Sequence, residues 1–258
     1  MSTWSLLGSD VATAVKTIAD AGFEYVELWG EIPHAYPDWA DKRRLVDALS
    51  SYDLTLTMHA PFTDLNVATP YEPVKGAVEK ALVAFLKYSM ELGASIATFH
   101  PGSVHNEAMV PQSISNAAAM IRSLAKAADG GITVCIENQA SGRSKYHYPL
   151  GSTVASLDAL LSQTEGISFT LDTGHAHAAR LDPLFLCDRY LDRLVEVHLS
   201  DNAGESDDHL IPGEGTADLK ALMGRVTGSH ALMCLELDPH RYRPDQVIDA
   251  SLAFKKNM

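Results

Sequence analysis

The chain has 258 residues, of which 46% are hydrophobic, and this predicts one folded domain over residues 1–258 rather than disorder. Its formal charge of −13 would repel a polyanion, so extended DNA binding is not expected. No apolar stretch is long enough for a membrane helix, no secretory signal is seen, and three cysteines lack a CxxC pattern, so we expect a cytoplasmic protein without a membrane partner.

Two strand-like segments come first along the chain, MSTWSLL at 1–7 and YVELWG at 25–30. Six further apolar runs each carry, near the C-terminal end, a side chain that can bind a metal. These runs cover residues 54–62, 95–102, 133–138, 167–175, 194–201 and 231–237. Patterns with helical spacing lie between the runs, and three of them close on Gly22, Gly93 and Gly130. Alternating strands and helices indicate a parallel sheet.

Eight strand–helix units in about 250 residues predict an α/β fold, a single (β/α)8 TIM barrel. In that fold the C-terminal ends of all strands face one rim, where active sites lie. A doubly wound open sheet is the alternative, but its crevice would collect side chains from fewer strands. The sequence therefore predicts a metal site at the C-terminal ends of the strands.

The residues near the C-terminal ends of the six runs are possible metal ligands. They are His59, His100, Glu137, Asp172, His198 and Glu236. A mixed set of imidazoles and carboxylates suits zinc first, with manganese or another transition metal as alternatives. A lone histidine at a strand end is usually a hydrogen-bonded surface residue, but six such endings in succession favour a metal site.

Three further residues enlarge the set of possible ligands. His175 follows Asp172 closely, and Asp207 and His209 flank Asp208 in an acidic loop. If residues 207–209 are locally extended, the side chains of Asp207 and His209 point the same way. One ion cannot use so many ligands, so we expect one to three divalent ions. A solvated acidic loop is the alternative explanation for 207–209.

Seven segments resemble the superfamily that joins endonuclease IV with the xylose isomerase-like sugar isomerases and epimerases, the AP endonuclease family 2. The segments are MHAPF, FHPGS, IENQ, LDTGHAHA, VHLSDN, DDHLIPGEG and LELD. They occur in the family's order, and MSTWS and GFEYVELW are similar to its first two strands. The resemblance implies a TIM barrel with a divalent-metal site.

The resemblance also implies two alternative sites. A one-metal isomerase or epimerase site would use four ligands, which are Glu137, Asp172, His198 and Glu236. A three-zinc endonuclease site would add five more, which are His59, His100, His175, Asp207 and His209. All of these positions match here, although sugar epimerases often carry an arginine where Asp207 and His209 stand. Short loops without basic inserts favour a sugar or sugar phosphate over a DNA duplex.

Three functions follow from these patterns. The first is a sugar or sugar-phosphate isomerase or epimerase that transfers a proton through a metal-stabilised enediolate. Glu137 and Glu236 would remove and return the proton, while His175 and His100 orient hydroxyl groups. The second is an endonuclease IV-like phosphoesterase, for abasic-site DNA or a small phosphoester, with a two- or three-zinc cluster. The third is a non-catalytic, metal-stabilised barrel that binds a ligand.

A second set of residues is expected to contact the substrate. Arg143 and Lys145, in the basic loop after the IENQ segment, could hold a phosphate or carboxylate group. Trp29 and Phe62 could form an apolar wall against a sugar ring, and His59 could contact the sugar as well. A solvated loop and ordinary core packing are the alternatives. The expected partner is a small sugar or sugar phosphate, and the protein would be a monomer or a homodimer.

Overall fold

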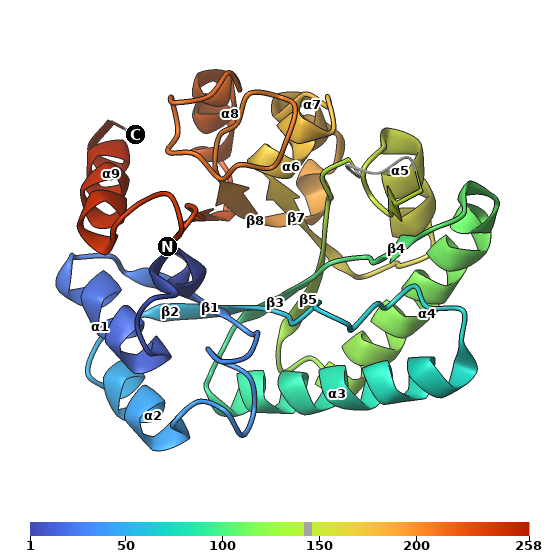
Figure 1. The fold of residues 1–258 in the computed structure, drawn as a ribbon, viewed down its shortest axis with the longest axis horizontal. Helices are drawn as coiled ribbons and strands as arrows, with labels where there is room; N and C mark the ends of the chain where they lie inside the picture. The colour runs from blue at the N-terminus through green and yellow to red at the C-terminus, as the bar shows by residue number, and fades with distance from the viewer. Residues whose placement is uncertain (142–145, 258) are drawn as a thin grey trace.

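The computed structural model describes residues 1–141 and 146–257. Its centre is a seven-stranded parallel sheet in the order β1-β2-β3-β5-β7-β8-β9. The strands are β1 (Tyr25–Trp29), β2 (Thr55–His59), β3 (Ile96–Phe99), β5 (Thr133–Glu137), β7 (Ser168–Asp172), β8 (Leu194–Leu199) and β9 (Leu232–Leu235). Neighbours in the sheet are also neighbours in the sequence, so helices return the chain from each strand to the next and lie around the strands (Figure 1).

Helices of 6 to 20 residues surround the sheet. They are α1 (Val11–Asp20), α2 (Lys42–Ser50), α3 (Glu72–Glu91), α4 (Val110–Ala128), α5 (Val154–Ser162), α6 (Thr173–Ala178), α7 (Pro183–Arg189), α8 (Leu219–Val226) and α9 (Pro244–Asn257). Side chains of Asp10 and Thr153 accept hydrogen bonds from backbone N–H groups at the starts of α1 and α5, as N-caps do. Among the described helices, none is long and apolar enough to cross a membrane.

The first predicted strand, residues 1–7, is wrong. Ser2 makes only an isolated parallel bridge to Glu27, and Thr3–Leu6 forms a 3₁₀ helix whose first turn is capped by the Ser2 hydroxyl. Ser2 nevertheless links the two ends of the sheet, because its N–H donates to the carbonyl of Leu235 at 2.9 Å. The barrel is therefore nearly closed by seven full strands and one short bridge. The predicted TIM barrel is confirmed, and an open sheet is excluded.

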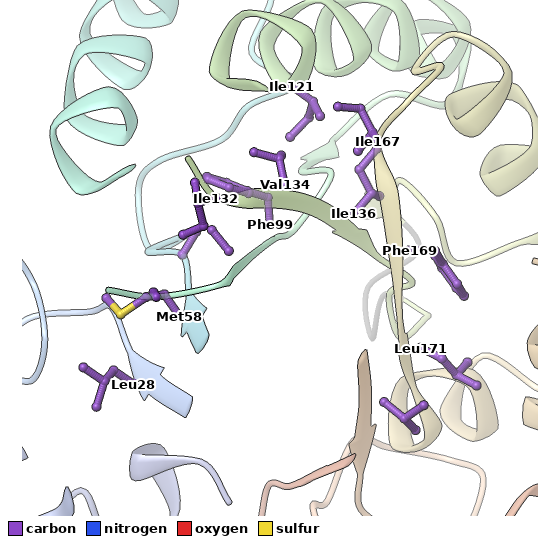
Figure 2. Packing of buried hydrophobic residues seen from close by; sticks show 14 of the residues in the cluster. Leu28, Met58, Phe99, Ile121, Ile132, Val134, Ile136, Ile167, Phe169 and Leu171 are labelled. Carbon is purple, nitrogen blue, oxygen red and sulfur yellow. The ribbon is translucent and has the colours of Figure 1, made fainter. Parts of the chain in front are cut away.

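The two faces of the strands carry different side chains. Apolar residues point outward to the helices, and Figure 2 shows this layer, with Ile121 of α4 near Val134 of β5. Polar residues point into the barrel, where the hydroxyls of Thr57 and Thr98 donate to the Glu196 carboxylate at 2.9 and 2.8 Å. Because successive side chains of a strand point to opposite faces, one short segment supplies both the apolar residues that face the helices and the polar residues that face the barrel interior.

The same alternation places the predicted ligands at the rim. His59 stands two positions after Thr57 in β2, and His198 stands two positions after Glu196 in β8. Since residues at this spacing share a face of the strand, both imidazoles point into the barrel mouth. Asp172 ends β7 directly opposite His198 in the register of the sheet. The strands therefore deliver these side chains to one end of the barrel.

Candidate metal centre

Nine side chains at the C-terminal rim form three groups of possible metal donors. Within each group, one donor atom from every residue lies within 4.8 Å of the others. The groups are His59–His100–Glu137, then Glu137–Asp172–His198–Glu236, and finally His175–Asp207–His209. We call them the first, inner and third groups. The nine residues that the sequence singled out as ligands are thus brought together.

Glu137 connects the first group to the inner group. Its Oε2 lies 2.9 Å from Nε2 of His100 and 3.5 Å from Nε2 of His59. Its other oxygen, Oε1, lies 2.9 Å from Nδ1 of His198. Glu137 is fully buried at the end of β5. One carboxylate therefore faces two neighbouring positions at which an ion could bind, which is how bridging carboxylates serve metal clusters.

Three of the histidines have a fixed ring orientation. The Nδ1 atoms of His59, His175 and His209 lie 3.0, 2.9 and 3.1 Å from backbone carbonyl oxygens. Since a carbonyl oxygen only accepts, Nδ1 carries the hydrogen in each ring and donates it. In the neutral ring Nε2 then keeps its lone pair, and in all three cases this atom faces a carboxylate of its group. Histidines that bind metals commonly show this arrangement.

Carboxylate oxygens without a partner give an independent indication of a cation. Among the described residues, Oδ2 of Asp172 and Oδ1 of Asp207 are buried and accept no hydrogen bond. Burying an ionised oxygen without a partner is costly. A divalent ion would satisfy these oxygens, which belong to the inner group and to the third group. The residues present therefore fit a metal of the zinc or manganese type.

The third group is formed by a loop rather than by strands. Oδ2 of Asp207 lies 3.1 Å from Nε2 of His175 and 3.1 Å from Nε2 of His209. Residues 207–209 are not extended throughout, because His209 has a φ of 43°, in the left-handed region, so the condition for simple alternation does not hold. The side chains of Asp207 and His209 nevertheless converge, close to His175 of α6.

Burial and neighbouring charges move the pKa values of the two glutamates of the inner group in opposite directions. Burial raises the pKa of Glu236 to about 8. Burial acts the same way on Glu137, but His100 and His198 outweigh it and hold the pKa of Glu137 well below its ordinary value. Burial also lowers the pKa of His100 to about 4. Paired groups with opposite shifts are typical of acid–base chemistry.

A cavity of about 610 Å³ opens above the donor groups. Six donors line it, which are His59, His100, His175, Asp207, His209 and Glu236. Trp29 and Phe62, expected at an apolar wall, lie on its surface together with Trp4. Glu137, by contrast, is fully buried and does not line this described cavity. Arg143 and Lys145 lie outside the described residues.

Loops from three strands enclose the cavity. The short strands β4 (Ser103–Val104) and β6 (Tyr148–Pro149) pair antiparallel, and Ser103 and Pro149 both line it. Asn66, from the loop after β2, donates from Nδ2 to the Ser103 carbonyl at 2.8 Å. A cavity of this size with tied loops suits a small molecule.

Two glutamates near the site were not identified as functional from the sequence. Glu27 lies in the middle of β1, and its Oε2 is 3.0 Å from Nε2 of His198, on the far side of that ring from Glu137. The alternation of β1 is a signal that places Glu27 inside the barrel. Glu31 accepts from the backbone N–H groups of Phe62 and Thr63 at 2.7 and 2.6 Å. No sequence pattern predicts that contact.

Comparisons with known proteins agree with the barrel fold. The family described as xylose isomerase-like TIM barrel matches residues 15–258. An uncharacterized protein of Methanocaldococcus jannaschii is 26% identical over 234 residues, covering 88% of this chain and 78% of that protein. A protein named "Probable endonuclease 4" of Aquifex aeolicus is 27% identical over 193 residues, covering 67% and 64%. The solved structure of a D-tagatose 3-epimerase-like protein has a TM-score of 0.86 at 23% identity, covering 99% and 95%.

Proposed function

Because the chain belongs to the xylose isomerase-like TIM barrel family, we propose that it is a divalent-metal-dependent isomerase or epimerase of a small sugar or sugar phosphate. The observation that carries the proposal is the cavity, in which metal-type donors and the rings of Trp4, Trp29 and Phe62 share one space of about 610 Å³. A sugar offers hydroxyl groups to the donors and an apolar C–H face to the rings. The likeness to a D-tagatose 3-epimerase-like protein supports this substrate class.

The inner group would hold the ion that serves the reaction. Its four residues are Glu137, Asp172, His198 and Glu236. Zinc is the first candidate, and manganese or another transition metal is the alternative. A bound divalent ion would draw electron density from a substrate carbonyl and so make the neighbouring C–H group more acidic. The first and third groups could hold a second and a third ion.

Glu236 is our first choice for the proton acceptor. It lines the cavity, so its carboxylate can face a bound sugar, as a general base must. The role of Glu137 in returning the proton stays a prediction, because Glu137 faces His198 from the same inner group but does not line the described cavity. His100 and His175 line the cavity and would orient hydroxyl groups, and His59 beside them would contact the sugar.

Solvent-deuterium incorporation tests this function. Candidate ketoses and their phosphates are incubated in deuterated water with the zinc-loaded or manganese-loaded protein, and the carbon next to the carbonyl is followed by NMR. We expect deuterium to enter at that carbon, and chelation or the Glu236→Gln substitution to stop it. Absence of exchange across a broad panel, with the metal content verified, would refute the proposal.

Phosphoester hydrolysis is the second candidate function. It is favoured by the sharing of Glu137 between two donor groups, with a third group beside them, because clustered ions suit in-line displacement at phosphorus. Likeness to a protein named as an endonuclease supports the same chemistry. Hydrolysis of abasic-site DNA or of small phosphoesters that requires Asp207 would establish it. No hydrolysis by protein carrying three zinc ions would exclude it.

The compartment, the domain organisation and the oligomeric state of the protein are also proposals. Cys135, Cys187 and Cys234 are buried free thiols, which supports a reducing cytoplasm. One contiguous cluster of apolar side chains supports a single domain over 1–258. A monomer and a homodimer are both consistent with the proposed chemistry, and gel filtration with light scattering distinguishes them.

A further inference from the structure

The loop that carries the third donor group is organised around one buried carboxylate. Asp201 is fully buried and follows β8. Its Oδ2 accepts from the N–H groups of Gly213 and Gly215 at 2.9 and 3.0 Å. Its Oδ1 accepts from the N–H groups of Asn202 and Ala217 at 2.8 and 3.1 Å. Four backbone donors from both ends of the loop therefore converge on a single side chain.

The backbone of Asp201 holds the middle of the same loop. Its N–H donates to the carbonyl of Leu210 at 2.9 Å, and the N–H of Leu210 donates to its carbonyl at 2.8 Å. Leu210 directly follows His209, a member of the third donor group. Asp201 thus fixes the chain just beyond His209 through its backbone and the following turn through its carboxylate.

Close packing at Gly215 depends on this arrangement. A Cβ atom built on Gly215 would lie 2.2 Å from Oδ1 of Asp201 and 2.4 Å from the carbonyl oxygen of Asn202. Only glycine allows the backbone to approach the carboxylate so closely. This approach explains Gly215, whereas Gly213 has a φ of 96° and open space around an added Cβ. Glu214 accepts from the hydroxyl of Tyr242 at 2.5 Å.

We propose that Asp201 is a positioning residue, which orders residues 202–217 so that Asp207 and His209 meet His175 on α6. This inference rests on the proposal that the third group binds a metal ion. Hydrogen bonds to an ionised acceptor are stronger than neutral ones, so four of them can hold a loop that lacks a helix or strand of its own. Without the carboxylate the four N–H groups lose their common acceptor, while His175 stays in place on its helix.

The test compares Asp201→Ala and Asp201→Asn with the unmodified chain, using zinc alone as the probe. Hydrogen exchange of the metal-free proteins should be at least tenfold faster at Gly213, Gly215 and Ala217 in Asp201→Ala. Zinc titration by calorimetry should show one ion fewer, or at least tenfold weaker binding of that ion. Asp201→Asn keeps one acceptor oxygen, so its exchange rates and zinc affinity should lie between those of Asp201→Ala and the unmodified chain. The inner group should bind zinc as before.

Two matched variants make the result specific. Glu214→Ala removes a carboxylate from the same turn without touching the four N–H groups, so its exchange and zinc binding should equal those of the unmodified chain. Asp207→Ala should lose the same ion as Asp201→Ala, but without faster exchange at Gly215.

Unchanged exchange in Asp201→Ala overturns the ordering role. Faster exchange with full zinc binding overturns the link between ordering and the third group. If the unmodified chain and Asp207→Ala bind equal numbers of zinc ions, the proposed metal at the third group is wrong, whatever the exchange data show for Asp201.

Discussion

The ring of Phe62 stacks on the imidazole of His100, with ring centroids 4.2 Å apart and planes inclined by 17°. Phe62 is 40% exposed and lines the cavity, so one face of the ring covers a member of the first donor group while the side chain still faces the ligand space. Glu31 fixes this position, because it binds the backbone N–H of Phe62. The geometry presents a rigid aromatic surface beside the possible metal ligands.

Phe62→Ala should therefore raise the Michaelis constant for the sugar and change kcat little. An aromatic contact contributes about 0.5–1.5 kcal/mol, which corresponds to about a twofold to tenfold rise. Steady-state kinetics on the ketose identified by deuterium exchange measure it. Tyr71→Ala, which removes another exposed ring that is not among the described cavity residues, serves as the control. Equal Michaelis constants in both variants would contradict an aromatic wall at Phe62.

Glu236→Gln should lower kcat by a factor of about 10²–10⁴, the usual contribution of a positioned acid or base. The amide keeps the shape of the side chain but cannot accept the substrate proton. Initial rates are compared with the zinc content of each preparation, which separates loss of the proton acceptor from loss of a ligand. A zinc-loaded variant with a kcat within threefold of the unmodified chain would show that Glu236 is not the acceptor.

Gly215→Ala and Gly224→Ala should change stability in opposite directions. At Gly215 the new methyl group would overlap Asp201 and Asn202, so we expect a loss of about 1–3 kcal/mol in the free energy of unfolding. Gly224 lies in α8 with nothing within 4 Å of an added Cβ, so alanine should add about 0.5–1 kcal/mol. Urea unfolding measures both values. A neutral Gly215→Ala variant would contradict the tight approach to Asp201.

The buried imidazole of His34 should make the protein less stable in acid. Burial lowers its pKa from 6.5 to about 4, so between these values the unfolded chain binds a proton that the folded chain does not. The free energy of unfolding should therefore fall as the pH drops from 6.5 to 4, by about 2–3 kcal/mol from this residue. In His34→Gln this contribution is absent. Urea unfolding at several pH values gives the free energy of unfolding of both proteins as a function of pH. The curve of the unmodified chain should fall more steeply toward low pH than that of His34→Gln, whereas parallel curves would contradict the lowered pKa of His34.

Local alternation made much of the barrel predictable from the sequence. In LTLTMH the two threonines and the histidine share one face, and the two leucines and the methionine share the other. The inward and outward layers follow from this pattern together with the parallel sheet. The convergence of His59, Glu137 and His198 could be predicted because the C-terminal ends of parallel strands meet at one rim of the barrel.

Contacts between distant backbone groups were not predictable in the same way. The strand expected at residues 1–7 failed because the Ser2 hydroxyl caps a 3₁₀ turn after a single bridge, a local preference that outweighs the apolar pattern. Asp207 and His209 converge through a loop held by Asp201, whose partners are backbone N–H groups that no side-chain pattern reveals. The course of the loop depends on those bonds, so alternation along residues 207–209 could not predict it.

The metal centre is tested most directly by the anomalous diffraction of crystals grown with zinc and measured at the zinc absorption edge. We expect a peak in the inner group, about 2.0–2.2 Å from Nδ1 of His198 and from oxygens of its three carboxylates. The carboxylates belong to Glu137, Asp172 and Glu236. A zinc-replete crystal without a peak among these four residues would contradict the proposed centre.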